Sequence, residues 1–593
     1  MPESAFSPHL PRIVRFGAFE VDFDARELRK RGLRLRVQRK PFQILELLLA
    51  RRGELVTRQE IAERLWPGLY VNFDHSLNTA VNTLRQVLSD SPRTPRFIET
   101  RPGLGYIFVA PIEPVGTQSS VPSQTERIES LAVLPFENTA HDPATDYLGD
   151  GIADNVISSL STLPGLRIVA RTTAFRYRDP SADPAEIGRQ LGVRALLMGK
   201  VTQRGDSLSV SSELIDSQTG WRLWGEQFER PAADAMTIER SIATRISTAL
   251  RMHLDGQQRG RIAKQHTGNS EAYQNFLKGR FFYNKMTPDA LQTSIAHFES
   301  AIAADPDYAL AYAGLADVHS LFAFLNVLPS DQALVRARDL ATTALRLDDE
   351  LAEAHASLAG VKKLYDWDWE GAEREYLRAL ELNPNYAAGR QSYAAHLSAQ
   401  GRSEEALREI RLAQQLDPLS LVINMEFAWH LYMARDFEAS REQSLKTLEL
   451  EPHFPAALHT LGIACEQLGE HDAAITHFRN ACAFSGNHPA ARAALAHAYA
   501  GSGRLDESRR VLQDLENTQS ERGLSPYWLS VVYCELGEGD AAIAKLQQGL
   551  ERRDVWMVWL AVEPRLDRLR PDPRFAELLR RIRLHNRAFT AIP

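Results

Sequence analysis

Six polar side chains on one predicted helix could recognise a nucleic acid. Residues 73–90 read FDHSLNTAVNTLRQVLSD, in which Leu77, Val81, Leu84 and Leu88 recur at the spacing of a buried helical stripe. The other face carries His75, Asn78, Thr79, Asn82, Thr83 and Arg85. Amides and hydroxyls can hydrogen-bond with base edges in a major groove, and an arginine can pair with phosphate. Taken alone, such a face could equally be solvated, so its context has to decide.

A predicted hairpin after this helix supplies a second contact. Residues 97–110 read FIETRPGLGYIFVA, with apolar arms around the turn Arg101-Pro102-Gly103-Leu104-Gly105. The tip could lie along a DNA backbone or in a minor groove, where the charge of Arg101 would face phosphate.

Other residue patterns argue against an enzyme. Gly199-Lys200 does not belong to a phosphate-binding loop, because Arg194 stands where the first glycine is needed and Val201 where serine or threonine should follow. The 17 histidines form no HExxH-like cluster. Asp150 and Asp154 lack partner ligands, which predicts ordinary surface charges. We therefore expect no catalytic site, no cofactor and no metal.

Charge and composition favour an intracellular protein that touches a polyanion with its N-terminal part. The net charge of the 593-residue chain is −7, yet residues 1–110 hold 18 Lys and Arg against 12 Asp and Glu. Three scattered cysteines, Cys465, Cys482 and Cys534, indicate buried, reduced thiols. With neither a membrane-spanning apolar run nor a signal-peptide pattern, the sequence predicts a cytoplasmic protein without a membrane partner.

The elements that must position the polar helix can be predicted from local patterns. Residues 15–35 alternate apolar and polar positions around turns, which predicts a small antiparallel sheet. A helix follows from residue 39 and stops at Gly53. Thr57 and Glu60 form a capping box for a second helix, which ends at Pro67-Gly68. The polar helix and the hairpin complete the unit.

This order resembles the OmpR/PhoB-type winged-helix DNA-binding domain over residues 14–110. The resemblance rests on Leu84-Arg85, on Leu55-Val56-Thr57-Arg58 with Leu65-Trp66, and on Ile98-Glu99-Thr100 before Gly103-Leu104-Gly105-Tyr106. It implies that the third helix enters the major groove of double-stranded DNA. Carried over by position, Asn78, Thr79, Asn82 and Thr83 would face bases, while Arg85 and Arg101 would face phosphates.

Two departures from this family keep an alternative open. Asn82-Thr83 stands where many relatives carry arginines, and Pro102 stands at a wing position that is often arginine. Affinity from one domain would then be modest. A protein-interaction scaffold whose winged helix does not read DNA is therefore the second hypothesis.

Downstream of a predicted flexible linker, residues 111–127, the sequence predicts a compact α/β domain. Residues 128–253 follow a β-α-β-α-β-β-β-α order. They resemble the TolB N-terminal-like domain through Ala132-Val133-Leu134-Pro135-Phe136, Gly149-Asp150-Gly151-Ile152 and Leu214-Ile215-Asp216, among other segments. That resemblance names a fold and implies no single chemistry.

The rest of the chain repeats with a period of 34 residues. Gly401, Gly469, Gly503 and Gly537 lie on one grid with Arg435 in the intervening slot, and Pro384, Pro418 and Pro452 occupy another slot. Glycine between paired helices and proline after the second are typical of tetratricopeptide repeats. We expect seven or eight helix pairs from about residue 270 to 550, followed by an end cap at RPDPRFAELLRRIRL, so that the solenoid with its cap covers residues 270–585.

The predicted whole is a multidomain protein, part α+β and part all-α. It has an N-terminal winged helix, a small central α/β domain and a C-terminal α-solenoid. We expect a bacterial one-component transcription regulator whose repeats bind a protein or peptide, with RNA polymerase as a further candidate partner. A spacer or dimerisation role for the solenoid stays open, and Tyr393, Trp429 and Tyr432 fit either a groove or helix packing. The pattern leaves the oligomeric state, the target promoters and the signal undetermined.

Overall fold

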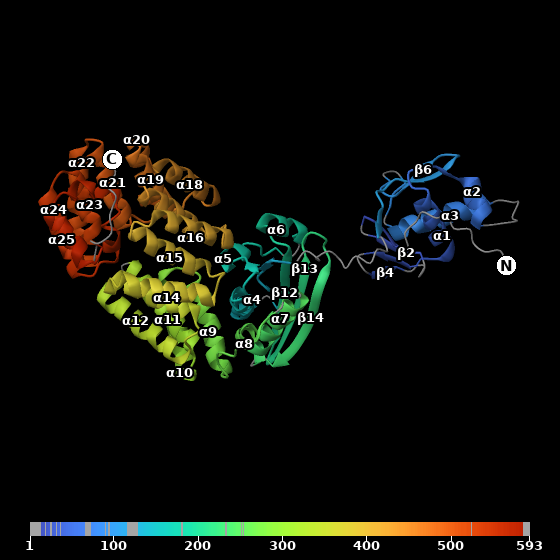
Figure 1. The fold of residues 1–593 in the computed structure, drawn as a ribbon, viewed down its shortest axis with the longest axis horizontal. Helices are drawn as coiled ribbons and strands as arrows, with labels where there is room; N and C mark the ends of the chain where they lie inside the picture. The colour runs from blue at the N-terminus through green and yellow to red at the C-terminus, as the bar shows by residue number, and fades with distance from the viewer. Residues whose placement is uncertain are drawn as a thin grey trace. The chain divides into compact units, whose positions relative to one another are not determined.

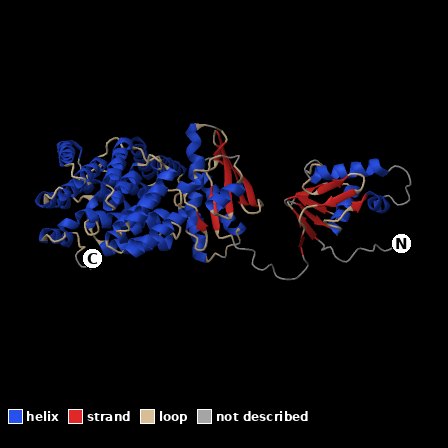
Figure 2. Cartoon of the chain, turned by 90° about the horizontal axis from the view of Figure 1, so that it is seen from above, coloured by secondary structure: helices blue, strands red, loops and turns tan. Residues whose placement is uncertain are grey.

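The fold was analysed in a computed structural model. It describes residues 13–584 apart from Ala18, 24–26, 31–32, Arg36, 66–72, Ser89, 93–94, 116–127, His141, 180–181, 232–233, Arg251, His253, Asn326 and 523–524. The chain divides into two compact units, Met1–Glu126 and Arg127–Pro593, which are described separately. Figure 1 gives the order of the elements, and Figure 2 shows where strands and helices lie along the chain.

The first unit combines two small sheets with three helices. Strands β1 (Ile13–Phe16), β2 (Phe19–Asp22), β3 (Glu27–Lys30), β4 (Leu33–Leu35) and β8 (Glu113–Val115) form an antiparallel sheet in the order β4-β3-β2-β1-β8. Helices α1 (Arg39–Ala50), α2 (Arg58–Leu65) and α3 (Phe73–Leu88) follow. Strands β5 (Val56–Thr57), β6 (Ile98–Arg101) and β7 (Gly105–Phe108) form the second sheet, in which β6 and β7 make a hairpin.

The buried apolar faces predicted for this unit meet in one core. Leu45 and Leu48 of α1 are fully buried together with Leu77 and Leu84 of α3. The predicted stop of the first helix lies near Gly53, which adopts a positive φ of 77°. Because side chains from every layer share this core, the first unit has the means to fold by itself.

The predicted capping box at the start of α2 is confirmed. The Thr57 amide donates to the Glu60 carboxylate at 2.7 Å, and the Glu60 amide donates to Thr57 Oγ1 at 3.2 Å. A hydrogen bond from Arg51, with those from Thr57, lowers the pKa of Glu60 to about 2. The predicted helix end at Pro67-Gly68 lies outside the described residues.

The predicted linker boundary at residue 111 is wrong. Glu113–Val115 pairs with β1 in antiparallel register, with Val14 opposite Pro114. The first unit therefore extends to Val115. The error has a physical cause, because a three-residue edge strand containing proline gives no alternating pattern to detect.

The central part of the second unit is an α/β layer. Its sheet has the order β11-β9-β12-β13-β14, and β10 also pairs with β12. The strands are β9 (Ser130–Val133), β10 (Glu137–Asn138), β11 (Arg167–Ile168), β12 (Ala195–Arg204), β13 (Ser207–Asp216) and β14 (Arg222–Pro231). The predicted position of Gly199-Lys200 within a strand is confirmed by β12.

Helices α4 (Asp146–Ser161) and α7 (Ala235–Ala249) contact each other and the sheet, and α5 (Arg171–Ala174), α6 (Pro184–Leu191) and α8 (Gly256–Ala263) lie around them. The turn η1 (Pro143–Thr145) precedes α4. The predicted stripe Ile152, Val156, Ile157 and Leu160 on α4 is buried.

Among the described residues eight helix pairs follow, in agreement with the 34-residue period. Figure 1 shows these repeat helices in the C-terminal part of the chain. They are α9 (Ser270–Tyr283) with α10 (Pro288–Ala304), α11 (Ala309–Phe324) with α12 (Ser330–Leu347), α13 (Ala352–Val361) with α14 (Trp369–Leu382), α15 (Ala387–Ala399) with α16 (Ser403–Leu416), α17 (Leu421–Met433) with α18 (Phe437–Leu450), α19 (Pro455–Gln467) with α20 (His471–Phe484), α21 (Pro489–Gly501) with α22 (Leu505–Arg522), and α23 (Pro526–Glu535) with α24 (Gly539–Glu551).

The turn within each of five later pairs needs a left-handed residue. Gly401, Gly469, Gly503 and Gly537 adopt φ values of 75°, 80°, 78° and 76°. Arg435 fills the same slot with φ 66°. A non-glycine residue is strained in this conformation. The left-handed backbone of the turn therefore explains why glycine recurs at this position of the 34-residue grid.

The predicted separation of the central domain from the repeats is wrong in one respect. A single hydrophobic core contains Val133 of β9, Ile242 of α7, Phe276 of α9 and Phe298 of α10. Farther along, the amide of Asn385 donates to the carbonyls of Ser161 and Leu166 at 3.0 and 2.9 Å. The central α/β layer and the first repeats are therefore one packed body, because α4 contacts both α7 and α9.

The C-terminal segment folds back onto earlier repeats. Turn η3 (Lys362–Asp366) contacts η4 (Val555–Trp559), and η5 (Pro564–Leu569) precedes the last helix, α25 (Pro573–Arg581). Trp369 Nε1 donates to the carbonyl of Ile582 at 2.7 Å, and Tyr432 donates to Glu563 at 3.0 Å. The predicted cap is present, and it also braces helices more than 100 residues earlier.

Within the described part of the chain, no helix is both long and apolar enough to cross a bilayer.

Candidate nucleic-acid interface

Helix α3 separates an apolar face from a polar one as its sequence predicts. Leu77, Val81, Leu84 and Leu88 are buried, whereas Asn78, Thr79 and Asn82 are exposed. Thr83 is half-buried, and its hydroxyl donates to the Thr79 carbonyl at 2.9 Å. Two amides and a hydroxyl thus lie at the surface of one helix face. His75 belongs to α3, but its side chain lies outside the described residues.

The structure contradicts the predicted phosphate contact of Arg85. Its side chain is buried, with the residue 6% exposed, and its guanidinium donates to the Ile98 carbonyl at 2.8 Å and to Thr100 Oγ1 at 2.7 Å. Arg85 therefore ties α3 to strand β6 of the hairpin. The reason is geometric, because position 85 lies four residues after Val81 and so borders the buried stripe.

A second network joins α2, α3 and the hairpin. The Asn78 side-chain oxygen accepts hydrogen bonds from Arg58 at 3.0 Å and from the Tyr106 hydroxyl at 3.1 Å. The Arg58 guanidinium also lies over the Tyr106 ring, 5.8 Å from its centroid. Asn78 is exposed but oriented, so one of its polar atoms is already engaged.

Arg58 was not among the predicted site residues. It starts α2, and its place beside the exposed face of α3 adds a cation to that face. The sequence signal that could have identified Arg58 was the segment Leu55-Val56-Thr57-Arg58, which was used only as evidence for the family resemblance. Its contact with Asn78 spans 20 positions in the chain, and helix periodicity cannot foresee such a contact.

The hairpin presents one cation and one apolar side chain at its turn. Arg101 is exposed and lies 3.2 Å from the Glu99 carboxylate, and Leu104 is 59% exposed. Gly103 has φ 74°, and a Cβ on Gly105 would lie 2.1 Å from the Val56 carbonyl. Glycine is required at these two places by turn shape and by close strand packing. The turn can therefore approach another molecule closely.

Among the described residues of the second unit, no group of three or more His, Cys, Asp or Glu side chains is arranged to hold a metal ion. The prediction that Asp150 and Asp154 are surface charges is wrong, because both are buried. Asp150 pairs with Arg178 at 2.8 Å, and Asp154 lies 3.4 Å from Arg280. Buried carboxylates require such partners, and these come from distant parts of the chain.

The aromatic residues proposed for a repeat groove pack inside the solenoid. Tyr393, Trp429 and Tyr432 are all buried. Trp429 lies edge-to-face with Trp559, at 5.6 Å between ring centroids, and Tyr432 donates to Glu563. The C-terminal segment thus covers this part of the repeats, and of the two open interpretations the structure favours helix packing.

Comparison with known proteins identifies three segments. The family "Transcriptional regulatory protein, C terminal" matches residues 32–108, and "HilA/YgeH-like transcriptional regulator, second domain" matches residues 126–245. A tetratricopeptide repeat family matches residues 467–522. The chain therefore carries an OmpR/PhoB-type DNA-binding domain, a HilA-like regulator domain and tetratricopeptide repeats.

Similar proteins divide into short and nearly full-length matches. "Putative adenylate cyclase 3" of Rhizobium meliloti is 29% identical over 249 residues, and the match covers 42% of this chain and 42% of that protein. "Transcriptional regulator HilA" of Salmonella typhimurium is 21% identical, covering 94% of this chain and 97% of that protein. "Transcriptional regulatory protein KdpE" of Mycobacterium tuberculosis is 31% identical, covering 16% of this chain and 43% of that protein. The matching domain families are of regulatory and repeat kinds.

Proposed function

We propose that this protein is a one-component bacterial transcription regulator. Its first unit binds double-stranded DNA, and its second unit receives the signal that alters binding or the recruitment of RNA polymerase. The observation that carries the proposal is the exposed face of α3, where Asn78, Thr79 and Asn82 stand on a helix whose opposite face is fully buried. The similarity to the transcriptional regulator HilA, which extends over nearly the whole length of both chains, supports the regulatory role.

The proposed roles of the residues follow from their chemistry. Asn82, Thr79 and the half-buried Thr83 read base edges, because amides and hydroxyls can both donate and accept. Arg101 at the hairpin and Arg58 at the start of α2 pair with phosphates. Asn78 positions Arg58 and offers its amide nitrogen to a base. His75 remains a predicted contact.

The second unit has a proposed regulatory role in the cytoplasm. Tetratricopeptide repeats commonly hold a protein or peptide, and we propose such a partner for this chain. The segment around η4 and η5 already covers Trp429 and Tyr432, so the partner would bind elsewhere on the repeats. The predicted likeness of the central α/β layer to a TolB N-terminal-like domain stays a prediction.

The test is selection of DNA by the protein itself. Full-length protein and the Met1–Glu126 unit are incubated with sheared genomic DNA of the source organism near physiological salt, and the retained fragments are sequenced. The proposal predicts a shared motif. Enrichment by the unit alone would mean that the second unit holds DNA binding inactive until a signal arrives. Failure of both to enrich any sequence would overturn the proposal.

One observation favours a second candidate, a scaffold whose first unit binds protein. Arg85 is buried and adds no charge to the exposed face of α3, and the side-chain oxygen of Asn78 already accepts a hydrogen bond from Arg58 within the unit. The scaffold hypothesis predicts that Asn82→Ala and Arg101→Ala leave cellular function unchanged. The regulator hypothesis predicts that both impair transcription from the selected promoters.

A further inference from the structure

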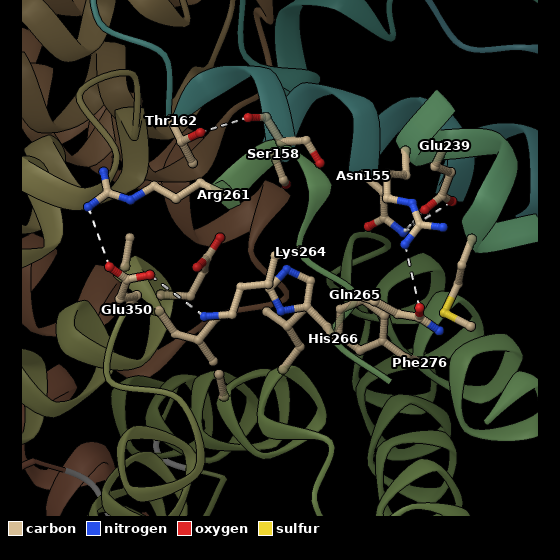
Figure 3. A pocket seen from close by; sticks show the side chains of 18 of the residues that line it. Asn155, Ser158, Thr162, Glu239, Arg261, Lys264, Gln265, His266, Phe276 and Glu350 are labelled. Atoms are coloured by element: carbon tan, nitrogen blue, oxygen red, sulfur yellow. Dashed lines mark hydrogen bonds and ion pairs between the residues drawn. The ribbon is translucent and has the colours of Figure 1, made fainter. Parts of the chain in front are cut away.

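A half-enclosed cavity lies where the central α/β layer meets the first repeats. Its volume is about 150 Å³. Figure 3 shows side chains from both parts pointing into it. We call it the junction cavity, and its argued lining residues are Asn155 of α4, Glu239 of α7, Phe276 and Arg280 of α9, Asp317 of α11 and Glu353 of α13. Cavities at such junctions are common ligand sites.

One wall of the junction cavity already has its charges balanced. Lys264 Nζ lies 2.6 Å from the Asp348 carboxylate and 3.8 Å from that of Glu350, which is also 3.7 Å from Arg261. Figure 3 shows Arg261 and Lys264 on either side of Glu350. This wall has little remaining attraction for an anion, because each cation has a carboxylate partner.

Three further carboxylates line the cavity, those of Glu239, Asp317 and Glu353, together with Arg240 and Arg280. Glu239 accepts hydrogen bonds from the Asn155 amide at 3.1 and 3.2 Å and from Tyr273, which are all neutral donors. Asp317 accepts one from the Ser357 hydroxyl, which also donates to the Glu353 carbonyl at 3.0 Å. Asp317 thus adjoins the first turn of α13.

The arginine that interacts with both Asp317 and Glu353 is Arg280, and it is already engaged. Its guanidinium lies 3.4 Å from the Asp154 carboxylate. Burial raises the pKa of Asp317 to about 6 and raises the pKa values of Glu239 and Glu353, even though Arg280 opposes the rise at Asp317 and Glu353. Clustered, buried carboxylates with raised pKa values at a cavity are typical of functional sites.

The cavity also offers apolar surface beside these carboxylates. Phe276 and Tyr308 line it, with ring centroids 5.2 Å apart. An alkyl chain can pack on such rings, and an ammonium group is attracted to their faces. A cavity of about 150 Å³ accommodates a ligand of roughly the size of benzene.

We propose that the junction cavity binds a small alkyl amine, with its ammonium group at Asp317 and Glu353 and its carbon chain along Phe276. The carboxylates of Asp154, Asp317 and Glu353 all interact with the single guanidinium of Arg280, and this local excess of negative charge selects a cation. The cations Arg261 and Lys264 already have carboxylate partners, which disfavours an acid.

Asp317, Glu353 and Phe276 belong to repeat helices, and Asn155 of α4 and Glu239 of α7 line the same cavity, so a bound amine would also lie beside the central domain. This inference deepens the proposed function by naming the chemical class of its signal. The signalling role of the amine rests on the proposed function, whereas the binding of the amine to the cavity does not.

The test measures binding to the full chain without DNA. Isothermal calorimetry and thermal unfolding are run with 1-butylamine and 1,4-diaminobutane as probes, and with 1-butanol and succinate as neutral and anionic analogues. The proposal predicts saturable binding and a raised Tm with an amine only. Equal responses to butylamine and butanol, or no response to either amine, would overturn it.

Two nearly isosteric variants localise the binding. Asp317→Asn and Glu353→Gln should each weaken amine binding by about tenfold, because each removes a charged hydrogen-bond acceptor. Glu271→Gln, at the exposed start of α9, is the matched control and should bind like the native protein. Native-like binding by both cavity variants would contradict the proposed site. If a variant fails to fold, the comparison of amines with butanol and succinate on the native protein still decides the proposal. A failed DNA selection would not change these results.

Discussion

The two units of this protein use their polar side chains in opposite ways. On α3, Asn78, Thr79 and Asn82 stand at the surface above a buried apolar stripe. In the second unit, Glu239, Glu563 and Arg565 are buried. Exposed polar groups are available to a large partner, whereas buried ones either stabilise the fold or serve a ligand small enough to enter. The comparison favours DNA recognition by the first unit. In the second unit it favours two roles for buried polar groups, namely anchoring the C-terminal segment against the repeats and binding a small ligand.

The largest effect is expected at the buried Glu563. Its carboxylate accepts hydrogen bonds from Tyr432 and Tyr527, each at 3.0 Å, and pairs with Arg565 at 2.9 Å. Glu563→Ala leaves a buried arginine without its partner and should destabilise the second unit by about 3–5 kcal/mol. Urea unfolding followed by tryptophan fluorescence measures this. Glu577→Ala, which removes one partner of an exposed ion pair, is the control. An equal loss of stability in both variants would contradict the role of Glu563 in anchoring the C-terminal segment to the repeats.

The same residue predicts a dependence of stability on pH. Burial alone would raise the pKa of Glu563, but Arg565 and the surrounding donors hold it at about 2. The unfolded value is about 4.3. Since the folded pKa is the lower one, the stabilisation is complete above about pH 5 and is lost as the pH falls towards 2. The stability difference between the native protein and Glu563→Gln should stay constant above about pH 5 and shrink as the pH falls from about 5 to 3. A constant difference would refute the assigned charge state.

Arg85 provides the next largest effect and sharpens the comparison within the first unit. Arg85→Ala removes two hydrogen bonds from a buried guanidinium to β6 and should destabilise the first unit by about 1.5–3 kcal/mol. DNA binding would fall through loss of the folded unit. Thermal unfolding of the Met1–Glu126 unit measures this, with exposed Arg101→Ala as the control. An unchanged Tm for Arg85→Ala, combined with weaker DNA binding, would restore the original phosphate role.

Asn82 tests base reading directly. Asn82→Ala should weaken binding to the selected motif by about 1–3 kcal/mol and leave binding to scrambled DNA unchanged. Its stability should match the native protein because the side chain is exposed. Gln86→Ala, also exposed on α3, is the matched control. Equal losses on motif and scrambled DNA would remove Asn82 from the base-reading set.

Arg101 gives the smallest effect. Arg101→Ala should weaken binding to all DNA sequences similarly and reduce the slope of log affinity against log salt by about one. Affinities measured at several salt concentrations provide the slope. An unchanged slope would mean that the hairpin cation stays with Glu99 and does not contact phosphate.

Local patterns were enough to predict most elements and the orientation of α3. The capping box at Thr57 and Glu60 and the buried stripe on α3 depend on neighbours within one or two helical turns, and the 34-residue grid repeats the same local turn along the chain. Each was confirmed. Such signals survive in the sequence because helix and turn geometry impose them locally.

Long-range burial was not predictable in the same way. Arg85, Asp150 and Asp154 look like surface charges on an amphipathic helix, yet strand β6 or arginines elsewhere in the chain cover them. The hydrogen bond between Tyr432 and Glu563 and the hydrophobic core shared by α7 and α9 likewise form only in the tertiary fold. Each of these contacts joins residues that are far apart in the sequence, and local helix and strand patterns do not relate such residues.

The most direct test of the central claim is the affinity ratio between selected and scrambled DNA. It is measured by fluorescence anisotropy at physiological salt with the full-length protein and with the Met1–Glu126 unit. A sequence-reading α3 predicts a ratio of at least about 10³ in one or both, and a reduction of that ratio by roughly 5- to 150-fold in Asn82→Ala. A ratio near one in both proteins would contradict the claim that the first unit reads DNA sequence.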